Sequence, residues 1–271
     1  MEKIERLKKI VKDLRNPDTG CSWDIAQTYK SISPYTIEES YEVFDAIENE
    51  DMLLLKEELG DLLFHIILYS EIASEDKLFS LDDVIEDVSD KMVRRHPHVF
   101  KKNKKDGDRK PSSNTTIWED IKAIERKNKA NIGYEETPSE LNGVAKSFPA
   151  LLRAFKLQQR ASRVGFDWHD EKGAIYKLKE EIAELEFEIQ QNPKNDDKIR
   201  EEMGDVLFSV SNLSRKLDLE PESVLKEGIK KFEKRFRYME MRLRAENRKI
   251  DNLMLEEFDV LWEEAKTIEN N

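Results

Sequence analysis

Four acidic residues form two pairs in the second half of the sequence, Glu181 with Glu184 and Glu202 with Asp205. The partners in each pair are three residues apart, so on a helix they share one side. Oxygen ligands without His or Cys select Mg²⁺, with Mn²⁺ as a substitute. Such ions bridge carboxylates and phosphates, neutralise phosphate charge and help to generate a hydroxide nucleophile. We therefore expect a magnesium site that handles a phosphorylated substrate.

Two neighbouring helices would have to position these carboxylates, because apolar residues recur at steps of three and four around both pairs. The two apolar stripes are Ile175, Leu178, Ile182, Leu185 and Ile189, then Met203, Val206, Leu207, Val210, Leu213 and Leu217. The short connection at 192–196 predicts an antiparallel pair. In each helix the acids lie roughly 70° and 130° from the stripe centre, turned in the same sense. We therefore expect all four carboxylates to border one groove.

The second acidic pair belongs to a phrase that occurs twice, EELGDLLF at 57–64 and EEMGDVLF at 201–208. Other segments repeat in the same order, such as WEDIKAIE at 118–125 and WEEAKTIE at 262–269. The sequence therefore predicts two homologous domains from an internal duplication, residues 1–129 and 145–271, joined by a linker at 130–144. The acids of the first copy, which would form a secondary metal site, are Glu39, Glu42, Glu58 and Asp61.

A glycine stands between the acids of each repeated phrase, Gly60 and Gly204. Glycine inside a helix costs about 1 kcal/mol relative to alanine. We therefore expect another backbone or a ligand to approach closely at both positions.

Composition indicates an all-α protein and argues against several other classes of protein. Nine Gly and eight Pro are too few for an all-β sandwich rich in tight turns. The net charge of −12 disfavours nucleic-acid binding, and phosphate must then be met by local cations or a metal. The single Cys21 excludes an internal disulfide and indicates a reducing cytoplasm. No signal peptide or membrane-spanning run is found. We expect two cytoplasmic antiparallel helical bundles.

Cations and aromatic residues could bind the rest of a phosphorylated substrate. Lys231 and Arg235 are four residues apart on a predicted third helix, and Lys91 and Arg95 match them in the first copy. A polyphosphate would need such a pair, although a solvated helix face is the simpler alternative. Trp262 and its match Trp118 could stack on a nucleobase or fill the core. Trp23 and Trp168 each follow a glycine that would stop a helix, and we expect both to line the mouth of a site.

These motifs resemble one family. The pattern EE-x-x-E, then E-x-G-D-hydrophobic-F, then K-F-E-x-R-F resembles the MazG nucleoside triphosphate pyrophosphohydrolases. The stretch from 20 to 47 and RRHPHVF at 94–100 resemble the two-domain bacterial form. The resemblance covers nearly the whole chain apart from the central linker. It implies an all-α bundle that forms homodimers and uses Mg²⁺ to hydrolyse nucleoside triphosphates, broadly across bases, to monophosphate and pyrophosphate. The implied role is removal of aberrant or surplus nucleotides.

The resemblance also implies a role for each candidate residue in the second copy. The metal ligands would be Glu181, Glu184, Glu202 and Asp205. The groups that bind the substrate would be Lys177, Lys231 and Arg235 at the triphosphate and Trp262 at the nucleotide. Glu201 would orient the attacking water.

The two copies differ at one informative position. Lys177 lies one helical turn before Glu181, on the same flank, and the matching residue before Glu39 is Tyr35. Tyrosine offers a phosphate no charge at pH 7. We therefore predict that the second domain is the principal catalyst. The first would be weakly active or mainly build the dimer.

Other functions are less well supported. No credible Ser-His-Asp or Cys-His set and no glycine-rich P-loop occurs. A di-iron site would need Glu-x-x-His pairs. His65 follows Asp61 by four, and its match in the second copy is Ser209. The alternative from another class is a nucleotide-sensing or protein-binding helical regulator with a vestigial site. Base preference, sugar preference and the number of metals per site stay open.

Overall fold

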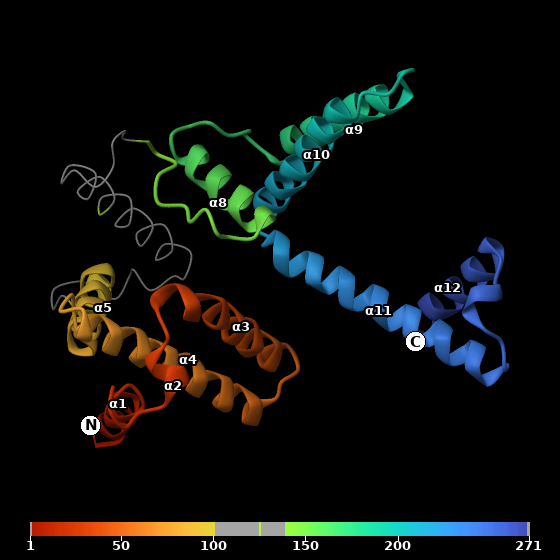
Figure 1. Ribbon diagram of the computed structural model, residues 1–271. Coiled ribbons are helices and arrows are strands. Elements are labelled where there is room, and N and C mark those ends of the chain that lie inside the picture. Colours follow the sequence, from red (N-terminus) through yellow and green to blue (C-terminus); the bar gives the residue numbers. More distant parts are fainter. Residues whose placement is uncertain (1, 101–124, 126–138, 270–271) are drawn as a thin grey trace. The chain divides into compact units, whose positions relative to one another are not determined.

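Helices are the only regular elements in the residues that the computed structural model of the protein describes, which are 2–100, 125 and 139–269 (Figure 1). The all-α prediction is confirmed. The chain divides into two compact units, 1–125 and 126–271, each described separately below. The predicted linker at 130–144 lies partly outside the described residues, so its boundaries stay a prediction. Among the described helices, none combines the length and the apolar character needed to cross a membrane.

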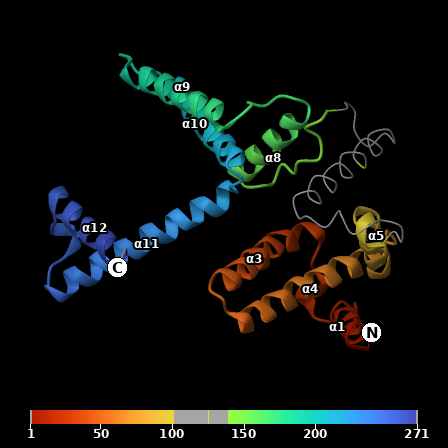
Figure 2. The same cartoon turned by 180° about the vertical axis from the view of Figure 1, so that it is seen from behind.

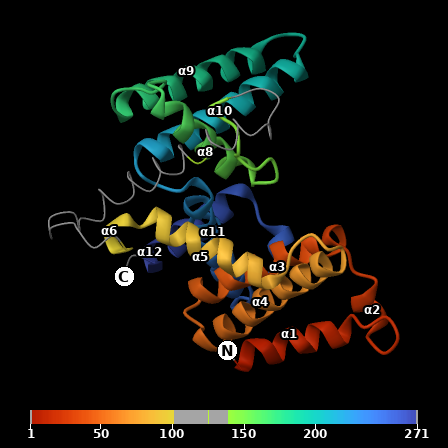
Figure 3. The same ribbon diagram turned by 90° about the vertical axis from the view of Figure 1, so that its left-hand side faces the viewer.

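The first unit is built on an antiparallel helix pair with further helices against it. Its helices are α1 (Glu2–Leu14), α2 (Ser22–Ile25), α3 (Tyr29–Glu48), α4 (Met52–Glu75), α5 (Leu81–Arg95) and α6 (Pro97–Phe100). Helices α3 and α4 form the pair, and α1 and α5 pack against α4. Figure 3 shows α1 beside α4. The core between them consists of Val11, Ile32, Ile67, Leu68, Ile72 and Leu81.

Side chains that accept from free backbone N–H groups set where the helices of this unit begin. Thr28 at the start of α3 and Ser80 at the start of α5 form capping boxes, and Asp51 accepts from two N–H groups at the start of α4. Such caps satisfy donors that a helix cannot satisfy internally. They therefore set the register of α3 and α4, the two helices that carry the acids of the first copy.

A buried arginine ties the segment after α1 to the end of α4. Arg15 is 9% exposed. Its Nε and Nη2 donate to the Glu75 carboxylate at 2.8 and 2.6 Å, and its Nη1 donates to the Asp24 carbonyl at 2.5 Å. A buried charge is tolerated only when it is paired in this way. Arg15 therefore links three parts of the first unit.

The second unit repeats the helix pair. Its elements are α8 (Ala150–Arg163), α9 (Glu171–Gln190), α10 (Asp196–Lys216), α11 (Pro221–Ala245), the 3-10 turn η1 (Ile250–Asn252) and α12 (Leu255–Glu269). Helices α9 and α10 form the antiparallel pair, and α8 packs against α10. Helix α11 contacts α8 and α10, and α12 packs on α11 around Met239, Leu243 and Leu261. Figure 2 shows α11 running away from the α9–α10 pair.

The apolar stripes of α9 and α10 lie largely outside the core of the unit. Met203 and Leu207 are 45% and 50% exposed, whereas the residues of α10 that are buried are Ser209, Ser211 and Asn212. The predicted helices are therefore present, but much of their apolar surface is uncovered in a single chain. An uncovered apolar surface of this kind is typical of a face that meets another protein chain.

Candidate metal and phosphate site

Three acidic side chains of the second unit converge across the α9–α10 pair. Glu181 from α9 and Glu202 and Asp205 from α10 each place a carboxylate oxygen within 4.8 Å of the others. Glu181 is buried, Glu202 is half-buried and Asp205 is exposed. The group therefore has a buried side and an open side from which a ligand can reach it.

The fourth predicted ligand, Glu184, lies beside this group rather than inside it. Glu184 and Glu202 line one small hollow on the pair. Burial, then a hydrogen bond with Glu181 and the charges of Glu181 and Glu202, raise the pKa of Glu184 against the lowering effect of Lys177. The raised pKa of Glu184 therefore reflects partial loss of water first and the nearby negative charge second.

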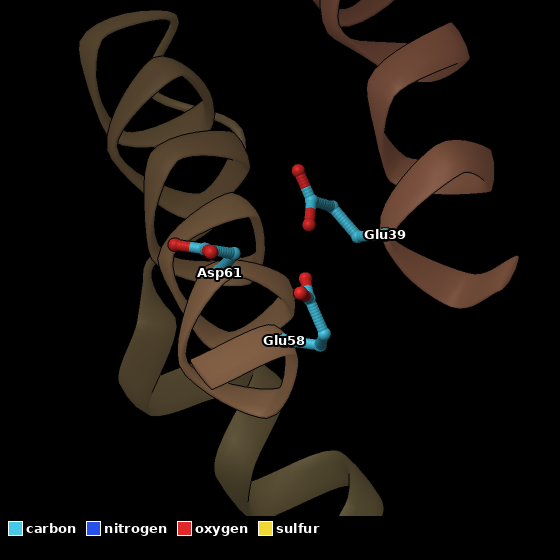
Figure 4. Close-up of side chains that lie close together, drawn as sticks. All are labelled: Glu39, Glu58 and Asp61. Atoms are coloured by element: carbon cyan, nitrogen blue, oxygen red, sulfur yellow. The ribbon is translucent and has the colours of Figure 1, made fainter. Parts of the chain in front are cut away.

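The first unit repeats the arrangement at the equivalent positions. Glu39 from α3 and Glu58 and Asp61 from α4 also place carboxylate oxygens within 4.8 Å of one another. Figure 4 shows the carboxylates of Glu39 and Glu58 facing each other across the gap between the helices. Burial and neighbouring acids, Glu42 among them, raise the pKa of Glu39 and of Glu58. Both copies therefore gather acids at one place on the helix pair.

The donor set suits a hard divalent cation. All three side chains in each group offer carboxylate oxygens, and neither group includes His or Cys among the described residues. Mg²⁺ prefers oxygen ligands and retains part of its water. Burial first, and then the charge of neighbouring acids, raise the pKa of Glu39 and Glu58 in the first unit and of Glu184 in the second, and a bound cation would offset both effects. The residues present therefore fit Mg²⁺ by ligand type and charge.

The lysine that distinguishes the two copies contacts the acidic group. The Nζ atom of Lys177 lies 2.8 Å from Glu181 Oε1 and 2.6 Å from Glu180 Oε1. Hydrogen bonds to these two carboxylates raise the pKa of Lys177, so its charge is secure at neutral pH. The matching Tyr35 of the first unit packs edge-on against Trp23 at 6.2 Å between ring centroids. A fixed cation therefore stands beside the acids at this position in the second unit, where the first unit has a tyrosine.

Three predicted substrate-binding residues form a separate group on α11 and α12. The Arg235 guanidinium lies over the Trp262 ring at 5.4 Å from its centroid, and Phe232 packs on the same ring. Lys231 is exposed on α11, one turn before Arg235. Figure 1 shows α11 running away from the α9–α10 pair, and none of these three residues belongs to the acidic group.

The matching cations of the first unit have a different partner. Arg95 donates from Nε and Nη2 to Glu125 Oε2 at 3.1 and 2.5 Å, and Arg94 also contacts Glu125. The hydrogen bond from Arg95 is the main reason why the pKa of Glu125 is lowered. Lys91 is half-buried on the same helix. Trp118 lies outside the described residues.

Glu201, the candidate for orienting water, lies on the exposed side of α10. Its carboxylate accepts a hydrogen bond from Lys198 Nζ at 3.0 Å. It is adjacent to Glu202 in sequence but is not one of the three converging acids.

The glycines inside α4 and α10 have no close neighbour. A Cβ added at Gly60 or Gly204 would meet nothing within 4 Å. The expected approach of another backbone is therefore not made by any described part of the chain, and the ligand alternative stays a prediction.

The structure adds a cavity that periodicity and motif spacing did not reveal. It has a volume of about 460 Å³. Lys177, Glu181 and Asp205 line one part of it, and Trp168 lines it as well. Gly173 allows this position of Trp168, because a Cβ there would collide with the indole ring. Gly173, eight residues before Glu181, was therefore the sequence signal that could have indicated where Trp168 lies in the wall of this cavity.

Comparisons with known proteins agree with the geometry. A family model described as the MazG nucleotide pyrophosphohydrolase domain matches residues 27–100 and 170–239. The first match includes α3 and α4, and the second includes α9 and α10. Both acidic groups therefore fall inside the matched segments.

Two curated proteins align with almost the whole chain. A nucleoside triphosphate pyrophosphohydrolase from Escherichia coli (strain K12) is 42% identical over 267 residues, with 98% of each chain covered. A Thermotoga maritima protein named nucleoside triphosphate pyrophosphohydrolase/pyrophosphatase MazG is 40% identical over 263 residues, covering 97% of this chain and 95% of its own. The crystal structure of a MazG-related protein from Thermotoga maritima is 28% identical and covers 44% of this chain and 97% of its own, with a TM-score of 0.36.

Proposed function

Because this chain belongs to the MazG nucleotide pyrophosphohydrolase family, we propose that it is a Mg²⁺-dependent nucleoside triphosphate pyrophosphohydrolase. It hydrolyses ribo- and deoxyribonucleoside triphosphates between the α and β phosphates and releases monophosphate and pyrophosphate. The observation that carries the proposal is the convergence of Glu181, Glu202 and Asp205 beside Lys177. Removal of aberrant or surplus nucleotides from the cytoplasmic pool is the proposed role, and the single exposed thiol of Cys21 is compatible with a reducing compartment.

The converging acids would hold the ion, with Glu184 beside them. Bound Mg²⁺ would neutralise charge on the triphosphate and polarise the bond to be cleaved. Glu181 and Lys177 are already in contact without substrate, at 2.8 Å. Lys177 is therefore held in place before the nucleotide arrives, and it can turn its three N–H donors to a phosphate oxygen at little entropic cost.

Glu201 stays our candidate for orienting the attacking water. Its carboxylate is held by Lys198 next to the ligand Glu202. Replacing Glu201 by Gln keeps the shape and removes the charge. We expect kcat to fall while KM stays nearly constant. A matched fall in thermal stability would instead indicate a structural role.

We further propose that the active form is a homodimer in which α11 of one copy meets the α9–α10 pair of the other. The uncovered stripes of α9 and α10, such as Ile182 at 41% and Leu207 at 50% exposure, support this arrangement. It would bring Lys231 and Arg235 to the triphosphate and Trp262 to the nucleotide.

Complementation tests the dimer. The Glu202→Gln and Arg235→Ala variants should each be inactive alone. When the two are co-expressed, about half of the dimers would be mixed, and each mixed dimer would contain one intact site. Activity of about a quarter of the wild-type value is therefore expected. No recovery in purified mixed dimers would contradict sharing of sites.

Product analysis tests the reaction. The protein is incubated with each triphosphate and Mg²⁺, and the products are separated by ion-exchange chromatography. Monophosphate and pyrophosphate are expected, and EDTA or the Glu181→Gln change should abolish their formation. Diphosphate and orthophosphate would refute the bond assignment. Tight nucleotide binding without turnover would favour the nucleotide-sensing regulator.

A further inference from the structure

The cavity beside the acids contains a buried hydrogen-bond acceptor that lacks a donor. Gln158 of α8 is 8% exposed and lines the cavity. Its Nε2 donates to the carbonyl of Phe208 at 2.9 Å, which defines the orientation of the amide. Its Oε1 is buried and has no hydrogen-bond partner in the described part of the chain. Buried acceptors are nearly always satisfied, so this oxygen indicates a missing donor.

A second amide lining the same cavity presents the opposite group. Asn212 of α10 is 7% exposed. Its Oδ1 accepts from Nε and Nη2 of Arg215 at 3.0 and 2.8 Å, which leaves its NH₂ as the donor. Arg215 is itself anchored by Asp167, at 2.5 and 3.1 Å. The cavity therefore offers one acceptor and one donor, both on anchored side chains.

The first unit has an apolar residue at the position that matches Asn212. The offset of 144 residues between the two copies of the repeated phrase pairs Asn212 with Leu68. Leu68 is 1% exposed and belongs to the core of the first unit. The fold therefore does not need a polar group at this position. The unit that has one is the unit with Lys177 beside its acids.

We propose that this cavity receives the nucleobase of the substrate, where Gln158 Oε1 accepts a hydrogen bond from a base N–H and the Asn212 NH₂ donates to a neighbouring base acceptor. The inference rests on the proposed function and states where the enzyme binds the base of its substrate.

Size and surroundings support this occupant. The volume of about 460 Å³ lies in the range of small-molecule sites. Trp168 and Phe166 line the cavity, and nucleobases stack on aromatic side chains of this kind. Lys177 and Glu181 line it too, so a triphosphate attached to a base in the cavity would lead to the acidic group. Trp262 does not line this cavity and would contact another part of the nucleotide.

Each common base has a donor next to an acceptor on one edge, so the two amides would accept all of them. Discrimination should appear only against a base that lacks the donor. Purine riboside triphosphate is such a probe, because hydrogen replaces the amino group of adenine. Sites built to hydrogen-bond an N–H reject analogues without it. We expect kcat/KM of the full-length enzyme with Mg²⁺ to favour ATP by roughly 10- to 100-fold.

Variants of the enzyme then test whether Gln158 causes the preference for ATP over purine riboside triphosphate. In Gln158→Leu the ratio of the two kcat/KM values should fall to near one, because the acceptor is absent. Gln159→Leu is the matched control on the same helix and should keep the wild-type ratio. The comparison of nucleotides on the wild-type enzyme needs no variant, so it stands even if Gln158→Leu does not fold.

The outcomes separate this inference from the proposed function. Hydrolysis of both nucleotides with equal kcat/KM would overturn the inference alone. A folded Gln158→Leu enzyme that still prefers ATP would overturn the role of Gln158. Hydrolysis of neither nucleotide by the wild-type enzyme would overturn the proposed function and this inference with it.

Discussion

Replacing Lys177 by Met tests the cation beside the acidic group. The change removes the charge and keeps a side chain of similar length. In the structure the Nζ atom contacts Glu181 at 2.8 Å and Glu180 at 2.6 Å. The side chain of Glu181 is 8% exposed and that of Glu180 is 57% exposed. The lysine therefore affects both phosphate binding and helix stability, and the two contributions differ in size.

Phosphate binding should dominate. A hydrogen bond to a charged group contributes about 1.5–3 kcal/mol, and about 1.4 kcal/mol corresponds to tenfold in rate. Lys177→Met should therefore lower kcat/KM by about 10- to 150-fold. Ion pairs within one helix contribute about 0.3–0.5 kcal/mol each. Two such pairs correspond to a fall in Tm of no more than about 4 °C for a unit of this size.

The assay is pyrophosphate release from ATP at saturating Mg²⁺, with Tm measured in the same buffer. Lys179→Met is the matched control, because Lys179 is exposed on another face of α9. It should leave kcat/KM within about twofold. Activity of Lys177→Met within twofold of wild type would refute the reasoning, as would an equal loss in Lys179→Met.

Three further predictions concern charged side chains in the two units. Glu202→Gln should lower ATP hydrolysis by at least about 100-fold, whereas Glu58→Gln should leave most of it because the second unit has the lysine; the reverse pattern in steady-state rates would place the principal catalyst in the first unit. Arg15→Met should lower the free energy of unfolding of the first unit by about 2–3 kcal/mol, because its buried guanidinium donates four hydrogen bonds; an unchanged urea midpoint would contradict that role. Burial raises the pKa of Asp167, but hydrogen bonds and charge from Arg215 outweigh it and leave that pKa lowered. The resulting stability is present above the ordinary aspartate pKa and is lost as pH falls through the lowered value. The difference in unfolding free energy between wild type and Asp167→Asn, measured by urea titration, should therefore shrink below about pH 4, and a constant difference would argue against the ion pair.

The acidic site was largely predictable from the sequence. The spacing of Glu202 and Asp205 places both on one side of α10, and the short connection makes α9 antiparallel to it. These relations are local, so they follow from helix geometry and chain length alone. The same is true of Lys177, one turn from Glu181. The internal repeat predicted the second acidic group, at Glu39, Glu58 and Asp61, by the same reasoning.

Tertiary structure decided what the local pattern could not. Periodicity shows that Met203 and Leu207 share a face of α10, but it does not say whether that face packs within the chain or stays uncovered. Lys231 and Arg235 lie in the KFEKRF segment of α11, but spacing within that segment does not say in which direction α11 leaves the α9–α10 pair. The buried amides Gln158 and Asn212 are 54 residues apart in sequence, and only the packing of α8 on α10 brings both to one cavity. Contacts between distant segments depend on how whole helices pack, and residue spacing within one helix carries no information about that packing.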